Sequence, residues 1–138
     1  MTKETNCLFC TLAPVNEILD SNEYAIAFLD MYPITKFHTL IIPRRHTSNY
    51  FGLERAERES IDELLTWQQK KMVKEDSSIT GFNIGWNCGE SAGQTVFHAH
   101  VHLIPRRKED IPKTQKKRAP APFINPWHES IKKQKKKK

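Results

Sequence analysis

The sequence predicts an α+β fold in which an antiparallel sheet of about five strands carries one long helix. Two observations lead to this prediction. Short apolar runs separated by turn-forming residues recur along the chain, as in antiparallel strands. One longer stretch instead repeats its apolar residues every three or four positions, as in an amphipathic helix. At 138 residues the chain is long enough for one domain with a single core.

The first two strands are expected to form a hairpin. Residues 15–20 and 24–30 are apolar-rich runs, and the turn-forming residues 21–22 lie between them. A third strand is predicted over residues 37–42. It should end at Pro43, because proline has no N–H to donate to a sheet ladder.

One long helix should follow. From Leu53 to Lys74, apolar side chains recur at intervals of three and four, and charged residues fill the opposite face. The next strand is predicted over residues 81–87, where large and small residues alternate. A loop with glycine near both ends, residues 88–93, then leads into the last strand. Glycine in such a loop lets the backbone approach an anion closely.

The last predicted strand, residues 94–105, carries three histidines. His98, His100 and His102 alternate with apolar residues. Successive side chains of a strand point to opposite faces, so the three imidazoles should share one face while the apolar residues face the core. Imidazole is nucleophilic near neutral pH and is also the commonest transition-metal ligand. The pattern therefore fits either a catalytic face or a hydrolytic zinc site with three histidines.

The three cysteines do not indicate a disulfide framework, because no export signal is expected from the first residues. Cys7 and Cys10 instead have the Cys-x-x-Cys spacing of a zinc hairpin or of a dithiol redox motif. One such pair supplies only two ligands. A tetrahedral zinc site would need two more from elsewhere in the chain.

The net charge of +6 is concentrated at the C-terminus. Six of the last seven residues, 132–138, are lysines, and the rest of the chain has 16 basic and 16 acidic residues. The folded part is therefore neutral, which does not indicate a nucleic-acid-binding domain. We expect residues 113–138 to form a basic, Pro/Lys-rich extension that is largely mobile. Its lysines suit a nuclear address or a polyanion tether.

No run of about 18 or more apolar residues is present, so no membrane-spanning helix is predicted. The first residues are also polar. We therefore expect a soluble protein that is cytoplasmic, or nuclear if the source is eukaryotic.

The stretch His98-Ala99-His100-Val101-His102-Leu103-Ile104 resembles the signature of the histidine triad (HIT) superfamily of nucleotide hydrolases and transferases. The resemblance covers roughly residues 6–112. It also includes Phe28-Leu29-Asp30, residues 37–46 and Gly93-Gln94-Thr95. The resemblance implies a HIT fold and a HIT domain over residues 1–112, in agreement with the pattern of strands and helix.

The resemblance also implies covalent catalysis at the α-phosphate of a purine nucleotide. By motif position His100 is the nucleophile that forms a nucleotidyl-histidine, which water then hydrolyses. His102 and His38 match positions that flank the α-phosphate and favour the charge that builds on its oxygens. Asp30 matches the acid that binds the ribose hydroxyls. The other implied substrate-binding residues are Phe28 and Met31 beside the base, Asn87 on the neighbouring strand, and Gly93, Gln94 and Thr95 near the phosphates.

A structural zinc ion is a further implication of the resemblance. In relatives with an N-terminal Cys-x-x-Cys, the matching ligands form a closed Cys2His2 site, here Cys7, Cys10, His46 and His98. Because His98 would be held by that ion, the resemblance implies that the reaction at His100 needs no metal.

Two functions remain open from the residues and the resemblance. The first is a hydrolase; residues 93–96 favour dinucleoside polyphosphates as substrates, whereas the cysteine pair and Asp30 favour adenosine phosphoramidates. The second is a nucleic-acid-associated module that acts on adenylated DNA or RNA ends, for which the lysine-rich tail argues. A nucleotide-binding scaffold without turnover is disfavoured, because the catalytic set is complete. The resemblance also implies a homodimer.

Overall fold

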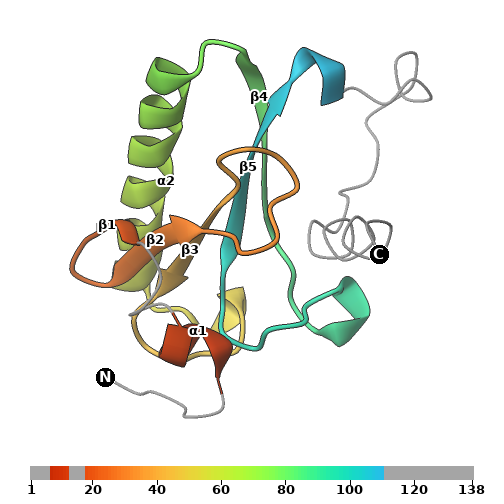
Figure 1. Cartoon of the computed structure of the whole chain (residues 1–138). Helices are drawn as coiled ribbons and strands as arrows, with labels where there is room; N and C mark the ends of the chain where they lie inside the picture. The colour runs from red at the N-terminus through yellow and green to blue at the C-terminus, as the bar shows by residue number, and fades with distance from the viewer. Residues whose placement is uncertain (1–6, 13–17, 111–138) are drawn as a thin grey trace.

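The computed structural model describes residues 7–12 and 18–110 (Figure 1). Its centre is a five-stranded antiparallel sheet of order β1-β2-β3-β5-β4. The strands are β1 (Ile18–Ser21), β2 (Ala25–Leu29), β3 (Thr39–Pro43), β4 (Ile79–Trp86) and β5 (Val101–Arg107). The helices are α1 (Leu8–Leu12) and α2 (Arg55–Glu75), with short 3-10 helices η1 (Tyr50–Gly52), η2 (Glu90–Ala92) and η3 (Lys108–Asp110).

The α+β prediction is confirmed: one sheet carries one long helix, and β1 and β2 form the expected hairpin. The start of the hairpin predicted at residues 15–17 lies outside the described residues. So does the extension predicted over residues 113–138, and the domain boundary near residue 112 stays a prediction. Within the described part of the chain, no helix has the length and apolar character that crossing a membrane requires.

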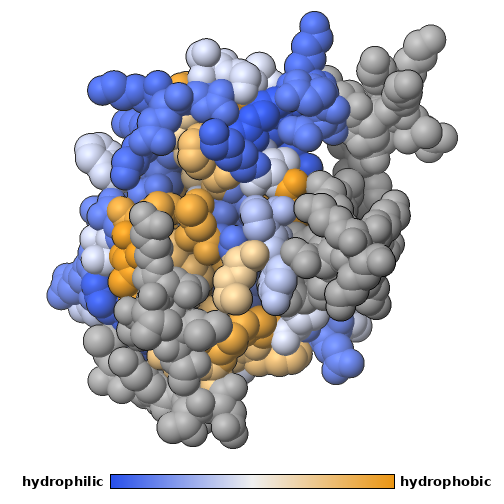
Figure 2. Space-filling view, in the orientation of Figure 1, coloured by the Kyte–Doolittle hydropathy of each residue, from blue (hydrophilic) through white to orange (hydrophobic). Residues whose placement is uncertain are grey.

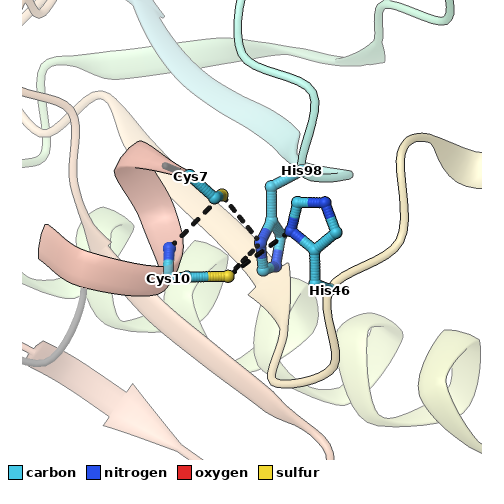
Figure 3. Close-up of side chains that lie close together, drawn as sticks. All are labelled: Cys7, Cys10, His46 and His98. Atoms are coloured by element: carbon cyan, nitrogen blue, oxygen red, sulfur yellow. Dashed lines mark hydrogen bonds between the residues drawn. The ribbon is translucent and has the colours of Figure 1, made fainter. Parts of the chain in front are cut away.

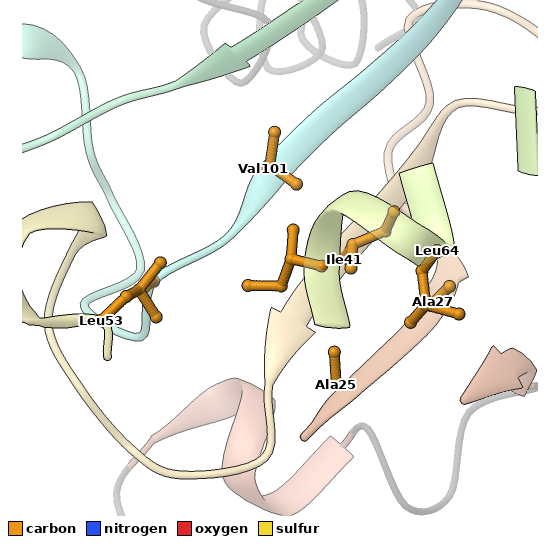
Figure 4. Packing of buried hydrophobic residues seen from close by; sticks show 8 residues of the cluster. Ala25, Ala27, Ile41, Leu53, Leu64 and Val101 are labelled. Atoms are coloured by element: carbon orange, nitrogen blue, oxygen red, sulfur yellow. The ribbon is translucent and has the colours of Figure 1, made fainter. Parts of the chain in front are cut away.

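Helix α2 covers one face of the sheet, against β2 and β3 (Figure 1). The core between them contains Ala25 and Ala27 of β2, Ile41 of β3 and Leu64 of α2 (Figure 4). The helix predicted over residues 53–74 is displaced by one or two positions. It begins after Glu54 because Glu54 and Glu57 form a reciprocal capping box that satisfies free N–H groups at its first turn.

The opposite face of the sheet carries α1. Phe28, Leu40 and Ile42 alternate with the residues that face α2, and they pack with Phe9 of α1. In the space-filling view, hydrophilic side chains cover the upper end of the molecule, where α2 ends, and apolar side chains gather lower down, near α1 (Figure 2). The sheet thus separates a helix-covered core from a second apolar layer built on α1.

Strands β3 and β4 differ from their predicted bounds. Strand β3 begins at Thr39 and not at Phe37, because Phe37 has a left-handed backbone (φ 77°) that does not continue into a strand. Pro43 is the last residue of β3 and lies opposite Ala25. Strand β4 begins two residues before the predicted start and ends at Trp86, one residue before the predicted end.

The histidine segment is a strand only in part. Strand β5 begins at Val101, so the prediction of a strand from residue 94 onward is wrong. Both neighbouring strands end their pairing with β5 at Val101, and the N–H of Ala99 donates to the carbonyl of Thr47 at 2.7 Å instead. Successive side chains of this segment nevertheless point to opposite sides, as they would in a strand. Ala99 and Val101 lie in the core beneath α2, whereas His98 and His100 contact Phe9 on the other side.

Candidate active site and metal centre

Four predicted zinc ligands come together beside α1. Cys7 directly precedes α1 and Cys10 lies within it, while His46 follows β3 and His98 precedes β5 (Figure 3). The Sγ of Cys7 is 3.4 Å from His98 Nδ1, and the Sγ of Cys10 is 3.4 Å from His46 Nδ1 and 3.5 Å from His98 Nδ1. One ligand atom from each of the four residues lies within 4.8 Å of the others. These residues could hold a metal ion.

The protonation of His98 suits metal binding. Its Nε2 is 2.9 Å from the carbonyl oxygen of Pro43, which can only accept, so Nε2 carries the hydrogen. The lone pair is therefore on Nδ1, the atom that faces the two sulfurs. Burial lowers the pKa of His98 to about 4, so the ring is neutral. Two cysteine sulfurs and two imidazole nitrogens, with one ring oriented by a backbone carbonyl, are a donor set typical of structural zinc.

His100 is buried next to this cluster. Its Nδ1 lies 2.8 Å from the carbonyl oxygen of His98, so Nδ1 donates and Nε2 keeps a free lone pair. Burial lowers the pKa of His100, which favours the neutral ring. The ring of Phe9 packs edge-on against that of His100, with centroids 5.0 Å apart. The imidazole is therefore neutral, held on two sides, and has one nucleophilic nitrogen.

His38, His102 and Asp30 form a second buried cluster. The Nε2 of His38 is 3.0 Å from His102 Nδ1. The Oδ2 of Asp30 is 3.4 Å from His38 Nε2 and 4.0 Å from His102 Nδ1. Burial raises the pKa of Asp30 to about 6, lowers that of His38 to about 3 and lowers that of His102 well below its usual value. Both histidines are therefore neutral near pH 7.

Gln94 is buried, and both the oxygen and the nitrogen of its side-chain amide form hydrogen bonds with backbone groups. Its Oε1 accepts from Gly89 N–H at 2.8 Å, and its Nε2 donates to the carbonyls of Ser48 at 2.6 Å and Val96 at 3.0 Å. The side chain thereby ties the loop before the histidines to the segment after β3. The predicted contact between Gln94 and a phosphate stays a prediction, and these bonds give the side chain a structural task as well.

The other predicted substrate residues differ in exposure. Phe28 is fully buried in the apolar layer around α1. Asn87 is buried after β4, and Met31 and Thr95 are exposed. Gly93 has φ 92°, a conformation that other residues rarely adopt, so a glycine is needed there. The contacts of these residues with a substrate stay predictions.

Three groups that hold the site were not predicted from the sequence. Phe9 packs on His100, the carbonyl of Pro43 sets the proton of His98, and the N–H of Ile34 donates to His38 at 3.1 Å. Only Phe9 left a signal in the sequence, because it lies between the two cysteines that are predicted to bind zinc. Backbone groups leave no signal in a side-chain pattern.

Comparison with known proteins identifies the family. The HIT domain model matches residues 15–109, which is more than half of the chain. The chain belongs to the HIT family. An uncharacterized HIT-like protein of Saccharolobus solfataricus is 40% identical over 110 residues, which cover 75% of this chain and 76% of the relative.

Solved structures agree with this HIT assignment. A HIT family protein from Bacillus anthracis has a TM-score of 0.72 and 30% identity, covering 96% of this chain and 94% of that one. A HIT family hydrolase from Clostridium thermocellum has a TM-score of 0.60 and 33% identity, covering 80% of this chain and 98% of that one. The fold of this HIT protein is thus shared over most of its length.

Proposed function

We propose that this HIT protein is a nucleotide hydrolase that cleaves adenosine phosphoramidates or dinucleoside polyphosphates at the α-phosphate. Family membership and its similarity to a HIT family hydrolase support hydrolysis in general. One observation carries the covalent mechanism: the hydrogen bond from His100 Nδ1 to the carbonyl of His98, which leaves the lone pair of a neutral ring on Nε2.

The reaction proceeds in two displacements. In the first, His100 Nε2 forms a bond to the α-phosphorus, and the bond to the departing amine or phosphate breaks, its electron pair leaving with that group. A departing amine takes up a proton from solvent. The carbonyl of His98 stabilises the positive charge that develops on the ring by accepting from Nδ1–H. In the second, the oxygen of water forms a P–O bond and gives up a proton to solvent, the N–P bond breaks with its electron pair returning to Nε2, and the nucleoside monophosphate leaves. Two moderate barriers replace one high barrier.

A structural zinc ion is the second part of the proposal. Cys7, Cys10, His46 and His98 would hold it, and bound zinc would supply a rigid link between α1 and the segment before β5. The carbonyl that orients His100 belongs to His98. Fixing the His98 ring therefore also fixes the backbone group that orients the nucleophile.

His100→Ala should lose turnover by several orders of magnitude and keep nucleotide affinity within a few-fold, because the ring bonds to phosphorus only during the reaction. The test uses adenosine phosphoramidate, diadenosine triphosphate, diadenosine tetraphosphate and adenylated DNA side by side, with relative kcat/KM as the measure. A radiolabelled adenylyl group should form an acid-labile adduct on the wild-type protein and none on His100→Ala. Labelling at another residue would contradict the mechanism.

The nucleic-acid alternative depends on the lysines of residues 132–138, which lie outside the described residues, and it stays a prediction. Preference for adenylated DNA in the substrate panel would favour it. The predicted homodimer also stays a prediction, and sedimentation of the purified protein would test it.

A further inference from the structure

A small cavity lies between the second half of α2 and the sheet, and its volume is about 110 Å³. Leu29 and Thr39, which pair at one end of the β2–β3 ladder, line it from the sheet. Gln68 and Met72, one turn apart, line it from α2. The core beneath α2 is not closed at this end, since Leu29 is 38% exposed.

This cavity lies on the other face of the sheet from the candidate active site. Leu29 continues the alternation of Ala27, which packs beneath α2. The ring of His100 contacts Phe9 on the opposite face. A molecule in the cavity would therefore not occupy the nucleotide site proposed above.

Gln68 is a buried polar residue in the wall of the cavity. It is 2% exposed, and its Nε2 has no hydrogen-bond partner among the described residues. Leaving a buried polar group unpaired lowers the folding equilibrium constant about 10-fold or more. The last torsion of a glutamine side chain is broad and two-fold, so a half-turn brings either end of the amide toward the cavity. The unpaired amide therefore points to a partner that enters from outside.

Phe37 is a second unfavourable feature of the same cavity. It lines the cavity with a φ of 77°, which bulky residues rarely adopt. The hydroxyl of Thr39 donates to the carbonyl of Phe37 at 2.8 Å and helps to hold this turn. Strained backbone of this kind is found where ligands are clamped. An unpaired amide and a strained aromatic residue thus line one cavity.

Water alone is a poor occupant of this space. The volume exceeds the share of one molecule in liquid water, about 30 Å³, several times. A buried water usually makes about three hydrogen bonds. Most of the wall cannot supply them, because the side chains of Leu19, Leu29, Phe37 and Met72 carry no strong hydrogen-bonding group. A molecule with an apolar body and one polar group fits the wall better.

The charges at the cavity do not select a charged molecule. Lys71 and Glu75 also line it, both exposed, and their opposite charges lie one turn apart on α2. We propose that the cavity binds a small uncharged carbonyl compound, such as a ketone or a lactam. Its oxygen accepts a hydrogen bond from Gln68 Nε2, and its hydrocarbon part packs on Leu29 and Met72. This site is independent of the proposed hydrolysis.

Four molecules of nearly the same size test the proposal on the whole protein. Cyclopentanone and 2-pyrrolidinone carry the carbonyl, methylenecyclopentane has a CH₂ group in place of the oxygen, and cyclopentylammonium carries a charge. The ¹H–¹⁵N signals of the Gln68 side-chain amide, assigned through its bonded carbons, follow binding. Both carbonyl compounds should shift these signals and bind with a Kd on the order of 1 mM. Methylenecyclopentane and cyclopentylammonium should bind about 10-fold more weakly, since neither offers an acceptor to the amide.

Three results would overturn the proposal. The first is that neither carbonyl compound shifts the Gln68 signals. The second is equal affinity for methylenecyclopentane, which would show a merely apolar void. The third is tighter binding of cyclopentylammonium, which would show a site for cations.

A Gln68→Met variant tests whether the amide is the group that recognises the carbonyl. Methionine has a similar size and no hydrogen to donate, so cyclopentanone and methylenecyclopentane should bind to this variant within about 2-fold of each other. Gln69→Met, which changes the neighbouring glutamine outside the cavity wall, should keep the 10-fold preference. A preference that survives in Gln68→Met would contradict the role of Gln68. If that variant does not fold, the affinities and amide signals of the wild type still decide.

Discussion

Asp30 is a buried carboxyl group whose negative charge destabilises the folded state. Its pKa rises from 3.8 to about 6 because of burial, although the N–H of Tyr32 donates to it at 2.8 Å. The folded state therefore binds more protons than the unfolded state between these two values. The stability linked to this raised pKa is fully present below about pH 4. It is lost as the pH rises through 6, because the buried carboxyl then loses its proton.

Asp30→Asn should therefore stabilise the protein at pH 8 by about 2 to 3 kcal/mol, because raising a pKa by one on folding corresponds to roughly 1.4 kcal/mol. Asparagine keeps an oxygen for the N–H of Tyr32 but carries no charge. The advantage should nearly vanish at pH 4, where Asp30 of the wild type is protonated. Urea unfolding at several pH values measures it, with Asp62→Asn on the exposed face of α2 as the control. A variant that is less stable than the wild type at pH 8 would show that Asp30 is stabilised by its histidine neighbours instead.

At the scale of elements, Arg45 links the start of α2 to the candidate metal site formed by Cys7, Cys10, His46 and His98. It directly precedes His46, and its guanidinium donates to both carboxylate oxygens of buried Glu57, at 2.8 and 3.1 Å. Burial alone would raise the pKa of Glu57, but the bonds from Arg45 and from the N–H of Glu54 outweigh it, so that the pKa is lowered. Glu57 thus serves both the helix cap and the loop that carries His46.

Arg45→Met should destabilise the protein by about 2 kcal/mol at pH 7, because it leaves a charged carboxylate buried without its partner. The loss should shrink below about pH 4.5, where Glu57 takes up a proton in the unfolded state and, without Arg45, also in the folded state. Thermal unfolding at pH 7 and pH 4 measures both effects. Arg55→Met, exposed at the first position of α2, is the matched control and should change stability by less than about 0.5 kcal/mol.

Much of the secondary structure was predictable because it depends on local pattern. The spacing of apolar residues placed α2 within two residues at each end, and the turn at residues 21–22 placed the first hairpin. Errors arose at strand ends, because the start of a strand depends on pairing with other strands and on the local backbone conformation. Val101 begins β5 because its neighbours stop pairing there, and the backbone of Phe37 turns before β3. The five-residue helix α1 was not predicted, since its contacts with distant residues outweigh any local preference.

The candidate site was predictable as a set of side chains but not as a network. The four metal-ligand candidates were implied by the resemblance, and the structure brings them together. The hydrogens of His38, His98 and His100 are instead set by backbone groups of Ile34, Pro43 and His98. Every residue has such groups, so a pattern of side chains does not by itself indicate which of them serve.

At the scale of the whole molecule, an ion in the candidate metal site should contribute to global stability. Its four candidate ligands come from separate segments of the chain, at residues 7–10, 46 and 98, so an ion bound there favours the folded state alone. Protein purified without chelator should contain about one zinc per chain, and chelation should lower the melting temperature by several degrees. Elemental analysis and calorimetry measure these outcomes.

A Cys10→Ser variant should melt near the temperature of the chelated wild type and respond little to chelator. Cys88→Ser, which changes a cysteine outside the cluster, should behave like the untreated wild type. Metal-free wild-type protein with an unchanged melting temperature would contradict a structural ion.

The position of β5 between β3 and β4 has a consequence for synthesis of the protein. Cys7 meets His98 across 91 positions of sequence. A ribosome adds roughly 5 to 20 residues per second, so Cys7 is synthesised roughly 5 to 20 s before His98. Until β5 inserts, the candidate metal site of a nascent chain is incomplete. The thiols of Cys7 and Cys10 therefore remain open to oxidation. Thiol labelling of ribosome-bound chains of increasing length should therefore show protection of Cys7 and Cys10 only after β5 has emerged.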